Sequence, residues 1–336
     1  MSSQGMVLVT PRSLQPREGR HHEALEPLLA RGLQIVYPEG QGPFPSDRLR
    51  PLVRGVCAAI IGLDHFDAAV VEAADSLRVV ARYGVGYDRV DVRACTARGI
   101  VVTNTPDANT VAVAEHAIAL MFGVARRLVE HHTGVLQGRW RPQPGIELAG
   151  RRLGLVGLGR IGLEVGRRCR ALGMTVAYYD VVRKPELEAT EGFRFLDFPQ
   201  LLSWADIVSL HAPYTPGSPP LIGAEELGRM SPGALLINTA RGELVDEEAL
   251  CQALQSGRLG GAGLDVFRQE PLPPSHPLLR LPNVLLSPHA AAQTRDAVRR
   301  MAESAVESVL DVLEGRRPRH VVNPEVYEGG RGGGAP

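Results

Sequence analysis

Short apolar runs alternate with longer, more polar stretches through the first hundred residues. The runs MVLVT, LQIVYP, VCAAIIG, LRVVARYG and IVVTNTP are all rich in Val and Ile. Strands that are apolar throughout, rather than at alternate positions, are typical of a parallel sheet with helices on both faces. The pattern therefore predicts a small α/β unit over residues 6 to about 103.

The same alternation resumes after residue 150. Strands are expected at LGLV, TVAYY, FRFLDF, DIVSLHAP, GALLINTARG, GAGLDVF and NVLLSPHA. This order predicts a second doubly wound parallel sheet, with its ligand-binding loops at the carboxyl ends of the strands. One long, mostly apolar helical pattern covers 109–137, and a final helix is expected over 293–315. The tail EGGRGGGAP is too rich in glycine to pack and is expected to be disordered.

A glycine-rich turn follows the first strand of the second sheet. Gly157, Gly159 and Gly162 form G-x-G-x-x-G where a helix should begin. The first glycine allows a tight turn, the second lets the backbone approach a pyrophosphate, and the third lets the helix lie against the strand. The N–H groups of Arg160, Ile161 and Gly162 would then point at the phosphates.

The strand TVAYY, which follows that helix, ends in Asp180. Its distance from the last glycine is close to the ~20 residues expected of an acid that binds an adenosine ribose diol. A carboxylate there would repel a 2′-phosphate. The sequence therefore predicts a dinucleotide-binding unit that takes NAD in preference to NADP.

Charge and cysteine usage narrow the function classes. The chain has 37 basic and 37 acidic residues, so electrostatics give no reason to expect nucleic acid or an anionic membrane as partner. The four cysteines are scattered without metal-ligand spacing, which is typical of reduced thiols in a cytoplasmic protein. No apolar run approaches the ~18 residues of a membrane helix, and no signal peptide is recognisable. Lys184 is the only lysine, so few routes to Schiff-base chemistry exist.

Three polar residues come directly after the last three predicted strands: Arg241 in INTARG, Glu270 in DVFRQEP and His289 in LLSPHA. Histidine can carry a proton near neutral pH, a carboxylate can orient the imidazole, and a guanidinium can bind a carboxylate with two hydrogen bonds. This set suits oxidation of a 2-hydroxy acid. Taken singly, each residue also has a structural interpretation, as a surface charge, a loop residue and a strand-end histidine.

Other polar positions carry weaker signals. The loop RYGVGYD directly follows a predicted strand and could present backbone N–H groups to an anion, although a plain turn remains the alternative. Within the helical pattern 109–137, His116, His131 and His132 are interpreted as structural, because no metal-ligand residues stand near them. No metal site is expected.

Six stretches, RYGVGYDRVD, NTPDANTVAVAEH, LGLVGLGRIG, INTARGELVDEEAL, GLDVFRQEP and SPHAAAQT, carry a resemblance. Over residues 6 to 324 the chain resembles the D-isomer-specific 2-hydroxyacid dehydrogenase family, and within it most closely the short form of 3-phosphoglycerate dehydrogenase without a regulatory domain. The resemblance implies a flavodoxin-like substrate domain, 1–103 and 293–325, around an inserted NAD-binding Rossmann domain, 104–292, with 326–336 as the tail. It also implies a homodimer that pairs through the NAD-binding domain.

The resemblance also assigns residues. It makes His289 the acid/base group, Glu270 its partner and Arg241 the anchor of the substrate carboxylate. The positions it assigns to the cofactor, beside the three glycines, are Thr105, Arg160, Ile161, Asp180, Thr239, Ala240, Arg241, Asp265, His289 and Ala291, with Asp265 accepting from the nicotinamide amide. The backbone of Val85 and Gly86 would hold the substrate carboxylate. Arg82 would bind a second anionic group on the substrate or, equally, brace its own loop.

Some positions depart from the family pattern. Arg89 stands where asparagine is usual, and Ala290 to Ala292 stand where glycine is frequent. Val85 occupies the position of the catalytic lysine in phosphite dehydrogenases, which argues against phosphite as substrate. The expected function is NAD-dependent hydride transfer to or from a small D-2-hydroxy acid, with 3-phosphoglycerate as one candidate substrate. The alternative is an NAD(H)-sensing, corepressor-like binding protein of the same fold.

Overall fold

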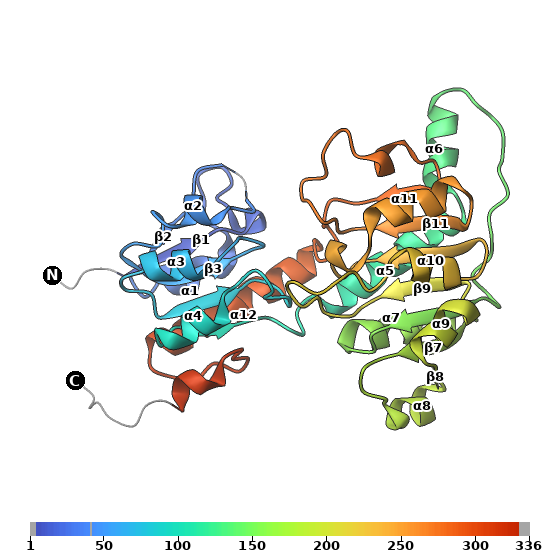
Figure 1. Cartoon of the computed structure of the whole chain (residues 1–336). Coiled ribbons are helices and arrows are strands. Elements are labelled where there is room, and N and C mark those ends of the chain that lie inside the picture. The colour runs from blue at the N-terminus through green and yellow to red at the C-terminus, as the bar shows by residue number, and fades with distance from the viewer. Residues whose placement is uncertain (1–4, 41, 329–336) are drawn as a thin grey trace. The chain divides into compact units, whose positions relative to one another are not determined.

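The structure, a computed structural model, describes residues 5–40 and 42–328, and the chain divides into two compact units (Figure 1). Unit 1 comprises Met1–Asn109 and Thr294–Pro336, and unit 2 comprises Thr110–Gln293. Each unit is built on a parallel sheet, which confirms the predicted fold class. Most of the predicted tail lies outside the described residues, but its first two residues belong to the 3-10 helix η5 (Pro324–Tyr327).

Unit 1 contains a five-stranded sheet in the order β2-β1-β3-β4-β5, with every pair parallel. The strands are β1 (Met6–Val9), β2 (Gln34–Val36), β3 (Val56–Ile61), β4 (Val79–Arg82) and β5 (Val101–Thr103), each within one of the predicted apolar runs. This strand order is that of flavodoxin-like folds.

Short helices connect the strands of unit 1. They are η1 (Arg12–Leu14), η2 (Glu23–Leu25), α1 (Glu26–Leu29), α2 (Ser46–Leu49), α3 (Ala68–Ala73) and α4 (Val92–Ala97). The long helix α12 (Arg295–Leu313) begins where Thr294 accepts a hydrogen bond from the N–H of Ala297, and it packs on β3 and β4. Chain segments far apart in sequence therefore share one core.

Unit 2 contains a seven-stranded parallel sheet in the order β12-β11-β10-β9-β6-β7-β8. The strands are β6 (Arg152–Val156), β7 (Thr175–Tyr179), β8 (Arg194–Phe195), β9 (Ile207–Leu210), β10 (Ala234–Asn238), β11 (Leu259–Leu264) and β12 (Val284–Leu286). The order reverses between β6 and β9. In a Rossmann fold, this switch point is where a dinucleotide binds.

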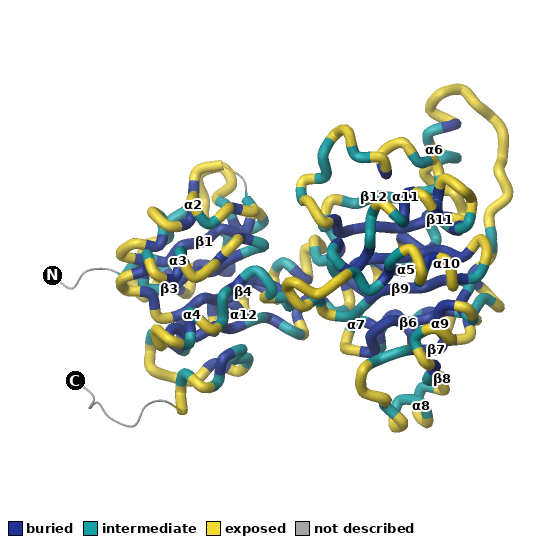
Figure 2. Tube along the Cα trace, in the orientation of Figure 1, coloured by how far each residue is buried: buried dark blue, intermediate teal, exposed yellow. Residues whose placement is uncertain are grey.

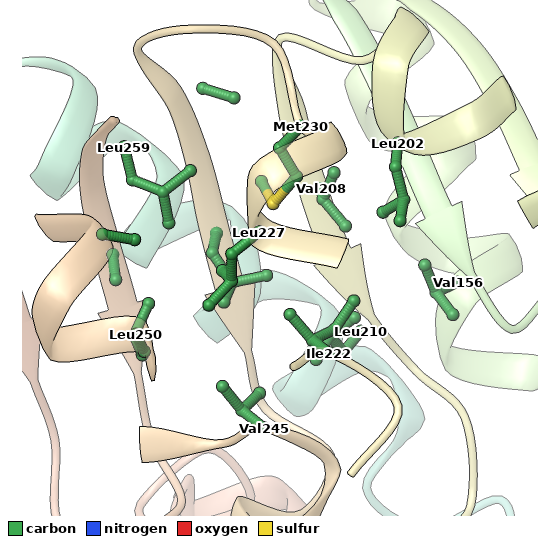
Figure 3. Packing of buried hydrophobic residues seen from close by; sticks show 14 of the residues in the cluster. Val156, Leu202, Val208, Leu210, Ile222, Leu227, Met230, Val245, Leu250 and Leu259 are labelled. Atoms are coloured by element: carbon green, nitrogen blue, oxygen red, sulfur yellow. The ribbon is translucent and has the colours of Figure 1, made fainter. Parts of the chain in front are cut away.

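Helices cover both faces of this second sheet. They are α5 (Thr110–Ala125), α6 (Leu128–Leu136), α7 (Arg160–Ala171), α8 (Pro185–Glu191), α9 (Phe198–Trp204), α10 (Ala224–Arg229), α11 (Glu247–Gln255) and the 3-10 helices η3 (Gly242–Leu244) and η4 (Pro277–Arg280). Apolar side chains of α5 and α7 form one buried cluster with the sheet, and those of α9, α10 and α11 form the other (Figure 3). The strands are therefore buried between two layers, as Figure 2 shows.

The predicted single helix over 109–137 is wrong in one respect. The helix α5 ends at Ala125, and α6 begins at Leu128. Between them Arg127 has a left-handed backbone, with φ 52°, which a continuous α-helix cannot contain. The apolar periodicity continues across the break and so did not reveal it. Within the described chain, no helix combines the length and apolar character that crossing a membrane requires.

Candidate cofactor and catalytic site

The glycine-rich turn lies between β6 and α7, at the switch point of the sheet. Gly157 has φ 93°, and a Cβ built there would lie 2.8 Å from the backbone of His211, so only glycine fits. A Cβ on Gly162 would collide with the carbonyl oxygen of Gly157. By contrast, a Cβ on Gly159 would have no atom within 4 Å. The backbone at Gly159 is therefore open to a ligand.

The start of α7 and the end of β7 complete this corner. Among the described residues, no side chain caps α7 at Gly159. Asp180 accepts hydrogen bonds from the N–H of Leu158 at 2.8 Å and of Val182 at 3.3 Å, and Lys184 lies 3.3 Å from its Oδ2. Burial alone would raise the pKa of Asp180, but these backbone hydrogen bonds and the Lys184 ammonium lower it. The carboxylate is thus held in its charged form beside the open glycine.

His289 and Glu270 meet beyond the ends of β12 and β11. Nδ1 of His289 lies 2.9 Å from Oε2 and 3.1 Å from Oε1 of Glu270, and Oε1 also accepts from the N–H of Phe267 at 3.1 Å. A carboxylate at Nδ1 fixes the tautomer that carries hydrogen on Nδ1. Nε2 is then the nitrogen that can exchange a proton with a substrate.

The carboxylate of Asp265 stabilises the turn that carries His289. His289 has φ 52°, a left-handed conformation that is uncommon for a residue other than glycine. Asp265 is buried, and its two oxygens accept from the N–H groups of Ala290 at 2.7 Å and Ala291 at 2.8 Å. The imidazole is therefore presented by a turn in which two successive N–H groups bind one carboxylate.

Two further residues belong to this support: Ser287, which the sequence did not single out, and His116, which was interpreted as structural. Ser287 donates to Oδ1 of Asp265 at 2.6 Å, and Nε2 of His116 lies 2.9 Å from the Ser287 hydroxyl and 3.4 Å from Oδ1. His116 therefore contacts the residues that hold the turn at His289. Since His116 lies on α5, nothing in its sequence neighbourhood indicates this contact.

The loop after β10 carries Thr239, Ala240 and Arg241. The side chain of Asn238 bridges this loop, donating to the carbonyl of Arg241 at 2.8 Å and accepting from the N–H of Ala240 at 3.0 Å. The hydroxyl of Thr239 is buried and has no hydrogen-bond partner among the described residues. A buried hydroxyl without a partner is destabilising, and a bound polar ligand would satisfy it. With the open Gly159 and the uncapped α7, this hydroxyl fits a dinucleotide.

The remaining predicted residues lie in unit 1. Arg82 ends β4, is only 8% exposed, and donates to the carbonyl of Tyr83, so its side chain folds back under Gly84. Thr105 accepts from the N–H of Gly84 at 2.9 Å, and the carbonyl of Val85 accepts from Asn104 at 2.8 Å. Thr105 therefore lies in unit 1, in contact with the loop that contains Val85 and Gly86.

Arg89, the departure from the family pattern, belongs to the same loop region. Its Nη1 donates to the carbonyl of Leu63 at 2.9 Å. Arg89 and Arg82 line a small cavity with Gly86, and the carboxylates of Asp64 and Asp88 line it too. Side chains of both charge signs are therefore among the residues that line this cavity.

Comparison with known proteins identifies the class. The model of the D-isomer specific 2-hydroxyacid dehydrogenase NAD-binding domain matches residues 118–291. A glyoxylate reductase of Korarchaeum cryptofilum is 46% identical over 81% of this chain and 84% of its own. A D-3-phosphoglycerate dehydrogenase of Archaeoglobus fulgidus is 38% identical over 90% of this chain and 57% of its own. The crystal structure of TT0316 protein from Thermus thermophilus is 45% identical, with a TM-score of 0.86 over 94% of this chain and 99% of its own.

The chain belongs to the D-isomer specific 2-hydroxyacid dehydrogenase family. The predicted family, the predicted cofactor NAD and the predicted oxidoreductase activity are thereby confirmed. The corepressor alternative receives no support. The resemblance to 3-phosphoglycerate dehydrogenases is real but is matched or exceeded by that to proteins named glyoxylate reductase, so the family alone does not select the substrate.

Proposed function

We propose that this NAD-dependent dehydrogenase interconverts a small, unphosphorylated 2-oxo acid of the glyoxylate type and the corresponding 2-hydroxy acid. The observation that carries the proposal is the His289–Glu270 pair, with Nδ1 and Oε2 2.9 Å apart, on a turn held by a buried carboxylate. The relatives described above add the substrate type, since one is named glyoxylate reductase.

In the direction of reduction, His289 donates the proton. Nε2 gives its hydrogen to the carbonyl oxygen of the 2-oxo acid as that oxygen becomes a hydroxyl, and Glu270 stabilises the imidazolium beforehand. Arg241 binds the substrate carboxylate and draws electron density from the adjacent carbonyl. NAD, when bound in its reduced form, supplies the hydride that C2 receives. In oxidation, each of these transfers is reversed.

The remaining sites follow from the same proposal. The backbone at Gly159, Arg160 and Ile161 binds the pyrophosphate, and Asp180 binds the adenosine ribose. The hydroxyl of Thr239 and the backbones of Ala240 and Ala291 contact the nicotinamide half of the cofactor. For Asp265 we favour support of the His289 turn over direct contact with the nicotinamide amide, because four hydrogen-bond donors already surround it: Ser287, His116, Ala290 and Ala291.

Unit 1 is the proposed substrate domain, and unit 2 is the proposed NAD-binding domain. The backbone N–H groups of Val85 and Gly86 bind the substrate carboxylate in this proposal, on a loop that Thr105 braces. The phosphoglycerate alternative depends on Arg82 as a phosphate ligand. Since Arg82 is 8% exposed and donates within its own loop, bracing is the better supported of its two roles.

A homodimer is proposed on the surface of unit 2. On α6 and the segment after it, Leu128, Val129, Val135, Leu136 and Trp140 are exposed, Trp140 by 84%. Such a group of large apolar side chains is typical of a protein interface. Light scattering would show a dimer, and Trp140→Glu would shift it towards monomer.

The four free cysteines agree with a cytoplasmic location.

Oxidation of NADH followed by absorbance tests the proposed substrate. The panel contains glyoxylate, pyruvate, hydroxypyruvate and the 2-oxo acid of 3-phosphoglycerate, at equal concentrations. We expect a higher kcat/KM for an unphosphorylated acid than for the phosphorylated one. A preference of more than tenfold for the phosphorylated acid would overturn the proposed substrate. Tight NADH binding without turnover of any 2-oxo acid would overturn the catalytic roles.

A further inference from the structure

Two cationic residues follow Asp180, and each is held by an acidic partner. Lys184 lies 3.3 Å from Asp180, as described above. Arg183 binds Glu188 of α8 through two hydrogen bonds, Nε to Oε1 at 2.7 Å and Nη2 to Oε2 at 2.8 Å. Its guanidinium carbon also lies 5.5 Å from the centre of the Phe195 ring. The guanidinium therefore points at α8 and β8.

Glu188 is itself fixed by a second contact. The hydroxyl of Tyr178, whose side chain is buried in β7, donates to Oε1 of Glu188 at 3.0 Å and accepts from the N–H of Lys184 at 2.7 Å. These bonds join the end of β7, the loop after it and the first turns of α8. The side chain of Glu188 is thus held in place by Tyr178 as well as by Arg183.

Apart from the Glu188 pair and the Phe195 ring, Arg183 is largely open to solvent. Its side chain is 60% exposed, and the two residues between it and Asp180, Val181 and Val182, are exposed as well. A long side chain three residues after the ribose-binding acid can reach a 2′-phosphate, and a guanidinium binds phosphate with two parallel hydrogen bonds. The bidentate pair with Glu188 is what occupies the guanidinium.

We propose that Glu188 is a specificity-determining residue for the cofactor. By holding Arg183 against α8, it withholds a cation from the 2′-phosphate position, and this adds to the repulsion from Asp180. The preference for NADH then has two parts, a carboxylate at the ribose and a second carboxylate that sequesters the nearest arginine. The inference rests on the proposed placement of the adenosine ribose at Asp180.

The test compares 5′-AMP with 2′,5′-ADP, which differ only by the 2′-phosphate, by calorimetric titration of the full chain. Glu188→Gln keeps an acceptor for Tyr178 but removes the charge that binds Arg183. We expect about a tenfold gain in affinity for 2′,5′-ADP, because hydrogen bonds to a charged group are stronger than neutral ones but this site is exposed to solvent. The affinity for 5′-AMP should change less than twofold.

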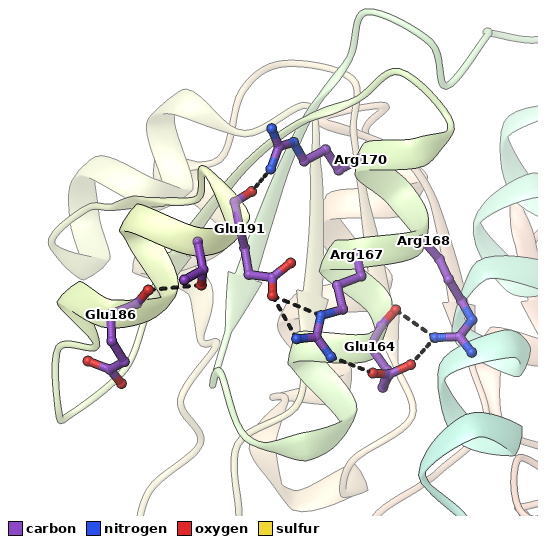
Figure 4. Close-up of polar contacts among 7 residues, drawn as sticks. Glu164, Arg167, Arg168, Arg170, Glu186 and Glu191 are labelled. Atoms are coloured by element: carbon purple, nitrogen blue, oxygen red, sulfur yellow. Dashed lines mark hydrogen bonds and ion pairs between the residues drawn. The ribbon is translucent and has the colours of Figure 1, made fainter.

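Glu191→Gln is the matched control. Glu191 lies on the same helix and pairs instead with Arg167 of α7, Nη2 to Oε1 at 2.6 Å (Figure 4). This variant removes the same charge without releasing Arg183, so it should leave the 2′,5′-ADP affinity unchanged. The double variant Glu188→Gln with Arg183→Gln should lose the gain. Thermal unfolding of each variant checks that α8 remains packed.

Three outcomes would overturn the proposal. They are no gain in Glu188→Gln with an unchanged unfolding temperature, an equal gain in Glu191→Gln, or a gain that persists without Arg183. Asp180→Ala separates these failures from that of the ribose placement. It should weaken 5′-AMP binding and improve the relative affinity for 2′,5′-ADP. If neither affinity changed in Asp180→Ala, the adenosine ribose would not bind at Asp180. Both the proposed ribose site and the proposed role of Glu188 would then be overturned.

Discussion

The loop after β4 in unit 1, proposed to bind the substrate, and the turn after β12 in unit 2, proposed to carry the acid/base histidine, are stabilised by different groups. Both follow a parallel strand, and both contain a residue with positive φ, Gly84 at 131° and His289 at 52°. The N–H of Gly84 is bound by a neutral hydroxyl, that of Thr105, whereas the N–H groups of Ala290 and Ala291, which follow His289, are bound by the buried carboxylate of Asp265.

The difference follows from what each turn presents. A loop that offers only backbone N–H groups can use glycine, which adopts positive φ without strain. A turn that must present an imidazole cannot use glycine, so the strain of a left-handed histidine has to be offset elsewhere. Hydrogen bonds to a charged group are stronger than neutral ones, which explains the carboxylate under His289. Variants of both turns test this comparison, and a variant of His211 tests the support of the glycine-rich turn.

The largest effect is expected for His289→Ala. It removes the proton carrier but leaves the Asp265 support in place, so kcat should fall roughly 10²–10⁴-fold while NADH affinity stays within about threefold. Steady-state rates and NADH fluorescence titration measure the two quantities. Turnover near that of the unmodified protein would remove His289 from the chemistry and with it the reason given for the strained turn.

Acid should destabilise unit 2 through His211, which lies behind the glycine-rich turn. Burial lowers the pKa of His211 to about 4. The folded chain favours the neutral imidazole. The contribution of His211 to the free energy of unfolding is therefore complete above the unfolded pKa of ~6.5 and is lost as pH falls towards 4, by at most about 3 kcal/mol. Denaturant unfolding between pH 7 and 4 should therefore be less steeply pH-dependent in His211→Gln. Equal pH dependence would contradict the assignment.

Asp265→Asn examines the carboxylate directly. The amide retains one oxygen, so the N–H of either Ala290 or Ala291 loses its acceptor, which should cost about 1–3 kcal/mol of unfolding free energy. The turn should also loosen, lowering kcat about tenfold or more. Ser287→Ala, which removes one donor to Asp265 and the hydroxyl that contacts His116, serves as the milder control. A stable Asp265→Asn protein with unchanged kcat would show that the turn holds itself.

Thr105→Val should give the smallest effect. It removes the neutral hydrogen bond to Gly84 while keeping the shape of the side chain, at a cost of about 1 kcal/mol. Since the loop presents backbone groups to the substrate, KM should rise and kcat should change little. Initial rates over a range of 2-oxo acid concentrations separate the two. A loss as large as that of Asp265→Asn would end the proposed contrast between neutral and charged support.

Backbone-level features were predictable from the sequence. Apolar runs placed the strands of both sheets, and the spacing of Gly157, Gly159 and Gly162 placed the turn at the switch point, because these features depend on local sterics and periodicity. The meeting of His289 and Glu270 was also predictable, since parallel strands bring their carboxyl ends to one edge of a sheet.

Contacts that depend on side-chain direction were not predictable. The guanidinium of Arg183 turns to Glu188, and no pattern in the sequence indicates this pairing. His116 reaches Ser287 across a distance in sequence that no local pattern spans. The helix break at Arg127 was not predicted either, because a single residue with a left-handed backbone leaves the apolar pattern of the sequence intact.

The single lysine of the chain also has a practical consequence. The Lys184 ammonium lies beside Asp180, next to the carbonyl of Leu158 at the glycine-rich turn. An amine-directed acylating reagent can therefore modify one side chain only, apart from the terminal amine. The extent of that modification, measured by mass spectrometry, would report whether a nucleotide occupies the proposed adenosine site at Asp180, even in a mixture of proteins. If NADH but not a 2-oxo acid protected Lys184 from acylation, this lysine would serve as a natural probe of cofactor binding.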